Sequence, residues 1–110
     1  MNRVIFSEWD KNKYNNFIQE LIRNSDDNFL EFNKKLIFTK YSMIGIRTPM
    51  LRDIAKKISK GDIISYLDSC DFIYYEEILL FGFILSYIKD LDCFIKYFYK
   101  FIDCIDNWAV

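Results

Sequence analysis

Two adjacent glutamates, Glu76 and Glu77, are residues whose type and spacing could support acid-base chemistry. Paired carboxyl groups act together when both side chains reach the same substrate atom. The surrounding residues predict a helix, and neighbouring residues of a helix point about 100° apart. The pair therefore does not converge on one atom. Its place in the first turn of that helix favours an interaction with the helix dipole instead.

Histidine is absent from the 110 residues. This excludes imidazole catalysis, Cys-His and Ser-His nucleophiles and nearly every common zinc site within them. The cysteines at positions 70, 93 and 104 show no C-x-x-C spacing and lie at apolar helical positions. We interpret them as reduced core thiols. No metal site or cofactor is predicted, and any chemistry within these residues must use carboxylates, lysines or tyrosines.

Charge is distributed unevenly along the chain. Residues 34–60 contain eight basic residues and one acidic residue, whereas residues 61–110 contain three basic and nine acidic residues. The net charge of the whole chain is only −1, which argues against strong indiscriminate DNA binding. The basic segment is therefore the part of the chain in which we expect a binding surface.

Within that segment, Arg52, Lys56 and Lys60 recur every four residues and so share one face of a predicted helix. Arg47 lies in the preceding loop, and Lys40 lies further upstream. Such a stripe can follow a phosphate backbone, so these five residues are the predicted DNA-binding set. The alternative is a solvated helix face, on which Asp53 and Lys57 would add about 0.3 kcal/mol as an i,i+4 pair.

The composition is typical of a globular helical protein. A hydrophobic fraction of 52% with three glycines and one proline permits long helices and few tight hairpins. No apolar run approaches the roughly 18 residues that a membrane span needs, and residues 1–20 show no secretory signal. We therefore expect one domain over residues 1–110, located in the cytoplasm.

Apolar periodicity predicts an all-α fold with six helices. The third is expected to begin with Thr48 as its N-cap and Pro49 as its first residue, and Gly61 and Asp62 separate it from the fourth. The others are expected at residues 11–23, after a cap at Ser25, at 74–88 in the middle of the core, and at 94–105. In the helix after Ser25, the residues expected to face inward are Phe29, Leu30, Phe32, Leu36, Ile37 and Phe38. The six helices pair naturally as three antiparallel hairpins.

The segment from Tyr41 to Lys57 contains the order Y-x-x-x-G-I-R-x-P-x-L-R-x-I-A-K. It resembles the DNA alkylation repair family, the HEAT-like alkylpurine DNA glycosylases, over roughly residues 25–110. The resemblance implies that the hairpins stack as an α-α superhelix, and that this chain is the N-terminal half of a longer protein. In such a superhelix each hairpin covers the apolar face of the one before it, so the last hairpin here would keep an uncovered apolar edge.

The resemblance also implies an activity, the excision of cationic N3- or N7-alkylated purines from double-stranded DNA. Trp108 matches the tryptophan of the family's catalytic segment and could supply an aromatic face to the cationic base; packing in a further helix is the alternative. The catalytic aspartate would follow Trp108 by four residues and has no position in this sequence. We therefore predict that these 110 residues are not an active enzyme.

Three hypotheses follow from the sequence. The first is the N-terminal half of a DNA repair protein of the alkylpurine glycosylase type. The second is a non-catalytic HEAT-like module that binds the DNA backbone or a protein. The third is a homodimer, in which a second copy covers the apolar edge that a missing C-terminal half would otherwise cover.

Overall fold

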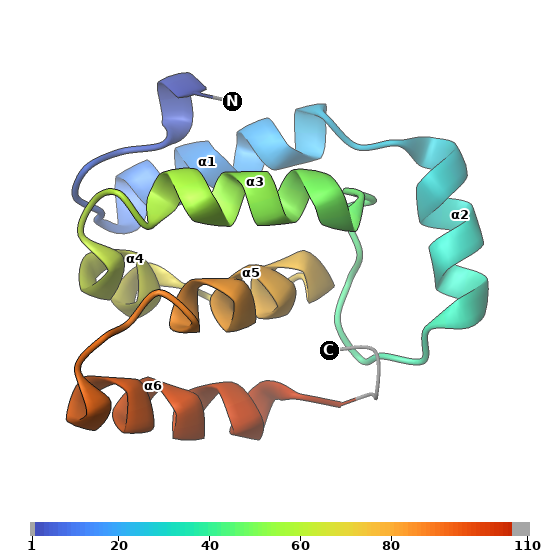
Figure 1. The fold of residues 1–110 in the computed structure, drawn as a ribbon. Helices are drawn as coiled ribbons and strands as arrows, with labels where there is room; N and C mark the ends of the chain where they lie inside the picture. The colour runs from blue at the N-terminus through green and yellow to red at the C-terminus, as the bar shows by residue number, and fades with distance from the viewer. Residues whose placement is uncertain (1, 107–110) are drawn as a thin grey trace.

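The computed structural model describes residues 2–106, which form one 3-10 turn and six α-helices with no named strand (Figure 1). The predicted all-α class is therefore confirmed. The elements are η1 (Asn2–Val4), α1 (Lys11–Arg23), α2 (Asp27–Leu36), α3 (Thr48–Ile58), α4 (Ile63–Ser69), α5 (Tyr75–Leu85) and α6 (Leu91–Cys104).

Helix α1 begins and ends where the sequence predicted. The side chain of Asp10 accepts a hydrogen bond from the backbone N of Lys13 at 2.8 Å, which satisfies one of the free amides of the first turn. Its buried residues recur at helical spacing and are Tyr14, Phe17, Ile18 and Leu21. Asp62 caps α4 in the same way, because its side chain accepts from the backbone N of Ser65 at 3.1 Å.

Helix α5 forms the centre of the molecule, between α3 on one side and α6 on the other (Figure 1). Its apolar residues surround nearly the whole helix, as the sequence predicted for the core. Gly82 allows the close approach of α6, since a Cβ there would lie 2.8 Å from the Phe101 ring. Helix α1 packs on α4, and an aromatic cluster fills the space between them: Trp9, Tyr14, Phe17 and Tyr66.

Only one of the three expected hairpins is among the closest helix pairs. These pairs are α3 with α5, α5 with α6, and α1 with α4. Helix α2 does not lie along α1 but runs across the ends of the other helices (Figure 1). The pairing of consecutive helices into three hairpins was therefore wrong as a description of the main contacts, and the HEAT-like superhelix stays a prediction.

The inward face predicted for α2 was also wrong in part. Asp26 rather than Ser25 is the N-cap and accepts from the backbone N of Phe29 at 3.0 Å. The helix ends at Leu36, and Phe32, Leu36 and Phe38 are 60%, 67% and 97% exposed. An amphipathic pattern predicts a helix, but it does not specify whether another element covers the apolar side.

The start of α3 differs from the prediction by one residue. Thr48 is already helical, and the N-cap is Arg47, which makes no side-chain capping bond. Pro49 follows in the first turn, where its missing N–H costs nothing. A side-chain cap is therefore less needed at this end of the helix.

Candidate nucleic-acid interface

Three of the five predicted residues form an exposed row along α3 and the turn that follows it. Arg52, Lys56 and Lys60 are all exposed, while the opposite side of α3 is buried against α5. The buried side consists of Leu51, Ile54, Ala55 and Ile58. Lys60 lies in the turn that follows the helix. Within residues 2–106 neither Lys56 nor Lys60 has an ion-pair partner, so both ammonium groups face solvent.

Arg47 is close to this row but is engaged within the molecule. Its guanidinium lies 3.2 Å from Asp26 Oδ2 and 4.8 Å from the centre of the Phe29 ring. The backbone N–H of Phe29 and the Arg47 guanidinium both lower the pKa of Asp26. The ion pair is exposed, so solvent screens it and it contributes little to stability. Arg47 therefore helps to hold the start of α2 against the loop before α3.

Lys40 lies apart from the row. Its backbone N donates to Asp106 Oδ2 at 2.7 Å, and its ammonium group is 5.3 Å from the centre of the Tyr41 ring. The Tyr41 hydroxyl in turn donates to the Cys104 carbonyl at 2.8 Å. These bonds place Lys40 beside the C-terminal end of α6, apart from the row on α3. Of the five predicted residues, three therefore form the row, Arg47 lies next to it, and Lys40 lies apart from it.

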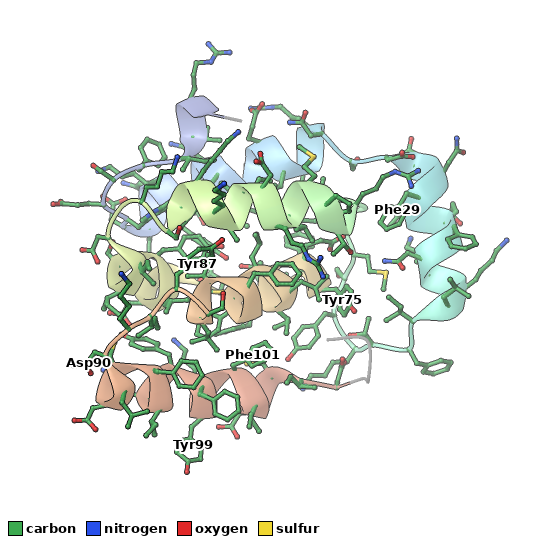
Figure 2. The ribbon with its side chains drawn as sticks, viewed as in Figure 1. Phe29, Tyr75, Tyr87, Asp90, Tyr99 and Phe101 are labelled. Atoms are coloured by element: carbon green, nitrogen blue, oxygen red, sulfur yellow. The ribbon has the colours of Figure 1, made fainter. Side chains whose placement is uncertain are left out.

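A groove of about 320 Å³ lies between α2, α3 and α5, and Arg52 is the member of the row that lines it. Three aromatic residues line it, namely Phe29, Tyr75 and Phe83, together with Asn33 and Arg52. Figure 2 shows Phe29 on α2 and Tyr75 at the beginning of α5, at the end of the molecule where α2 stands. Burial and nearby carboxylates raise the pKa of Tyr75, so its hydroxyl is neutral at physiological pH.

Arg52 separates this groove from a second hollow of about 330 Å³ between α3 and α5. Its guanidinium lies 5.4 Å from the centre of the Phe83 ring, which lines both spaces. The second hollow also includes Ala55, Ser86 and Tyr87. A cation and an aromatic ring at the border of two hollows form a surface that suits an anionic ligand carrying planar groups. A third, larger hollow of about 410 Å³ near Lys34 and Tyr41 contains no second cation.

Glu76 and Glu77 have a role that the sequence did not predict. Both lie in the first turn of α5, as expected, but each side chain is only 1% exposed. The Glu76 carboxylate accepts from the backbone N atoms of Ile44, Gly45 and Ile46 at 2.9, 2.8 and 3.2 Å. The Glu76 side chain therefore fixes the loop before α3, and all of its hydrogen bonds within the described residues are made to that loop.

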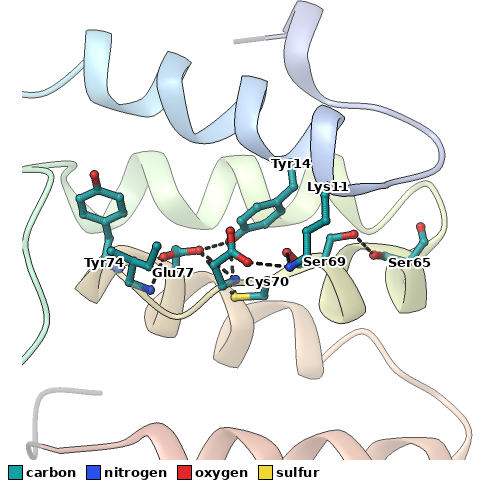
Figure 3. A network of polar contacts seen from close by, with 9 residues as sticks. Lys11, Tyr14, Ser65, Ser69, Cys70, Tyr74 and Glu77 are labelled. Carbon is teal, nitrogen blue, oxygen red and sulfur yellow. Dashed lines mark hydrogen bonds and ion pairs between the residues drawn. The ribbon is translucent and has the colours of Figure 1, made fainter.

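Glu77 fixes the other loop that meets this end of α5 (Figure 3). Its carboxylate accepts from the backbone N atoms of Ile73 and Tyr74 at 2.7 and 2.8 Å, and from the hydroxyl of Tyr14. Burial and the neighbouring Glu77 raise the pKa of the Cys70 thiol to about 12. The thiol is thus protonated and unreactive at neutral pH. Buried carboxylates bound to backbone amides are structural groups, and neither glutamate is placed as a catalytic acid or base.

The aromatic lining of the groove and the burial of the two glutamates were not predicted from the sequence. The sequence did contain a signal for the burial of the two glutamates, because they are at the start of a helix that is apolar on nearly every side. Trp108, to which the resemblance assigns an aromatic role, lies outside the described residues. Across residues 2–106 no group of acidic or cysteine side chains is arranged to hold a metal ion.

Among the helices of residues 2–106, none combines the length and the apolar character that crossing a bilayer requires. Comparison with known proteins gives no match to this chain among protein-family models, curated proteins or solved structures.

Proposed function

We propose that this protein is the DNA-contacting helical part of a DNA repair protein of the alkylpurine glycosylase type, and that these residues bind double-stranded DNA without excising a base. The observation that carries the proposal is the exposed row of Arg52, Lys56 and Lys60 beside a groove lined with aromatic rings. The resemblance of residues 41–57 to the DNA alkylation repair family supports the choice of ligand.

The charges suit a phosphate backbone. Arg52 and Lys56 are four residues apart, or about 6 Å along the axis of α3, and Lys60 follows in the turn after the helix. Duplex DNA carries one negative charge per about 1.7 Å of its axis, so the row spans several phosphates. Lys56 and Lys60 lose no internal ion pair on binding, because none is present among the described residues. Only the counterions of the DNA need to be displaced.

We expect no base excision because the carboxylate near the groove is already bound by backbone amides of the protein. Glu76 is the acidic residue that lines the groove, and its carboxylate oxygens accept from three backbone amides. A carboxylate held in this way does not reach a sugar to stabilise its developing positive charge. Contact with DNA is therefore assigned to α3, and no residue between 2 and 106 is assigned a catalytic role.

A salt titration with a fluorescently labelled DNA duplex tests the proposal. We expect K56A/K60A to weaken binding and to reduce the slope of log K against log salt by about two, since each phosphate contact contributes about 0.9. The matched control, K35A/K89A, removes the same charge from α2 and from the loop before α6, and should leave the slope nearly unchanged. Equal losses in both variants, or binding without salt dependence, would contradict the proposal. The second result would favour a protein partner.

A further inference from the structure

The two hollows beside α3 follow one another along the paired helices α3 and α5. The groove of about 320 Å³ lies near the beginning of α5, where Tyr75 lines it. The second hollow, of about 330 Å³, lies further along both helices and is lined by Ala55 and Tyr87. Figure 2 shows Tyr75 and Tyr87 near opposite ends of α5. The hollows are therefore arranged in a line, and Arg52 and Phe83 stand at the border between them.

Aromatic rings and guanidinium groups are paired at the groove. The Arg47 guanidinium lies 4.8 Å from the centre of the Phe29 ring, and the Arg52 guanidinium lies 5.4 Å from the centre of the Phe83 ring. Both rings line the groove and are partly exposed. A planar guanidinium that lies against a ring has a second face, on which a nucleobase can stack while the N–H groups donate to a phosphate. Planar surfaces and positive charge thus occur at the same place.

The size and the polar lining of the groove suit one base. Volumes of about 320 and 330 Å³ are at the lower end of those of ligand pockets. The side-chain amide of Asn33 lines the groove and makes no hydrogen bond to the other described residues, so it can pair with the edge of a base. Glu76 also lines the groove, but its carboxylate is bound by three backbone amides and is directed to the loop before α3.

The hollows and the row together indicate which form of DNA fits. In a duplex each base is stacked between its neighbours and its pairing edge is occupied, so a duplex contacts the row without filling the hollows. Proteins bind single strands by combining cationic groups along the backbone with aromatic groups on which the bases stack. Arg52 stands between the two hollows as a phosphate stands between two bases. The strand would then continue towards Lys56, one helical turn further along α3.

We propose that the two hollows bind unpaired nucleotides of a DNA strand, with one base on each side of Arg52 and the phosphate between them on its guanidinium. The inference rests on the proposed function, because it concerns the same DNA that α3 contacts. It adds a preference for DNA in which a duplex continues into a short single-stranded segment. One base stacked on an aromatic group strengthens binding by about tenfold.

Fluorescence anisotropy with two DNAs of equal charge tests this preference. Both contain the same duplex; one carries a short single-stranded overhang of thymine nucleotides, and the other carries an overhang of abasic nucleotides with the same number of phosphates. We expect the thymine overhang to bind about tenfold more tightly. Phe83→Leu removes the ring that lines both hollows and should abolish the difference. Phe32→Leu, at an exposed ring that lines neither hollow, is the matched control and should preserve it.

A second readout does not depend on the variants. A 2-aminopurine base in the overhang loses fluorescence when it stacks, so binding of the unmodified protein should quench it. Equal affinity for the two overhangs, or unchanged fluorescence, would overturn the inference, and so would a preference that persists in a Phe83→Leu variant shown by circular dichroism to be helical. None of these results alters the salt titration of the row. Preference for the thymine overhang with no change of salt slope in K56A/K60A would instead support the hollows and contradict the proposed function.

Discussion

Helices α5 and α2 are similar in length and both carry acidic residues in the first turn, yet they relate to the core in opposite ways. Of the 11 residues of α5, eight are buried, whereas none of the 10 residues of α2 is buried. The difference lies in what surrounds each helix. Two helices and two anchored loops enclose α5, while α2 meets the body mainly through its first turns. Burial therefore depends on position in the assembly of helices as much as on the composition of the helix itself.

The largest effect should come from removing an anchor of α5. Glu77→Ala leaves the backbone N atoms of Ile73 and Tyr74 and the hydroxyl of Tyr14 without their acceptor in a buried site. Hydrogen bonds to charged groups contribute about 1.5 to 3 kcal/mol each, so we expect a loss of about 3 kcal/mol or more. Urea denaturation followed by circular dichroism measures the free energy of unfolding.

The matched control for this experiment is Glu31→Ala on α2. The Glu31 side chain is exposed and lies 4.0 Å from Lys34, so its removal should change the stability by less than about 0.5 kcal/mol. Comparable losses of unfolding free energy in the two variants would show that α5 is not better anchored than α2 in solution.

A smaller effect on the free energy of unfolding is expected at Gly45, which contacts both Glu76 of α5 and the start of α2. Its φ angle is +95°, its N donates to Glu76, and its carbonyl accepts from the backbone N of Asp26 at 2.9 Å. A Cβ there would lie 2.8 Å from Leu30 Cβ, on α2. Gly45→Ala should therefore cost about 1 to 3 kcal/mol from backbone strain and the collision. Asn16→Ala, at an exposed position of α1, is the control and should be neutral or slightly stabilising; a neutral Gly45→Ala would refute the strain.

The smallest effect should come from the outer face of α2. Phe32→Ser and Leu36→Ser remove exposed side chains, so each should change the free energy of unfolding by no more than about 0.5 kcal/mol. Leu80→Ala in α5 removes a fully buried side chain and should cost about 2 to 5 kcal/mol. The same denaturation measurement applies to all three variants. A loss above about 1.5 kcal/mol in Phe32→Ser would mean that this face is covered in solution.

Local signals allowed much of the helical framework to be predicted. The apolar spacing over residues 11–23 and the break at Gly61 and Asp62 act within a few residues, and α1 and α4 start where these signals lie. The environment of α2 could not be predicted in the same way. Whether Phe32 and Leu36 are covered depends on where helices distant in the sequence lie, and periodicity contains no information about that.

For the candidate site too, local spacing predicted which residues share a helix face but not their contacts with residues distant in the sequence. The four-residue spacing of Arg52 and Lys56 places them on one face whenever α3 is a helix, and this part was predictable. The pairing of Arg47 with Asp26 joins residues 21 apart, and the bond from Lys40 to Asp106 joins residues 66 apart. Contacts at such separations depend on the tertiary arrangement, so the spacing predicts that Arg52 and Lys56 share a face but not what Arg47 and Lys40 contact.

The two buried glutamates also have a consequence for how α5 is oriented. Because α5 is apolar on nearly every side, its hydrophobic pattern distinguishes rotations about the helix axis only weakly, although Gly82 must face Phe101 of α6. A shift of one residue turns the side chains by about 100° and would carry both carboxylates away from their loops. Glu76 and Glu77 thus add a polar constraint on the rotational register of α5 to the one that Gly82 sets against α6.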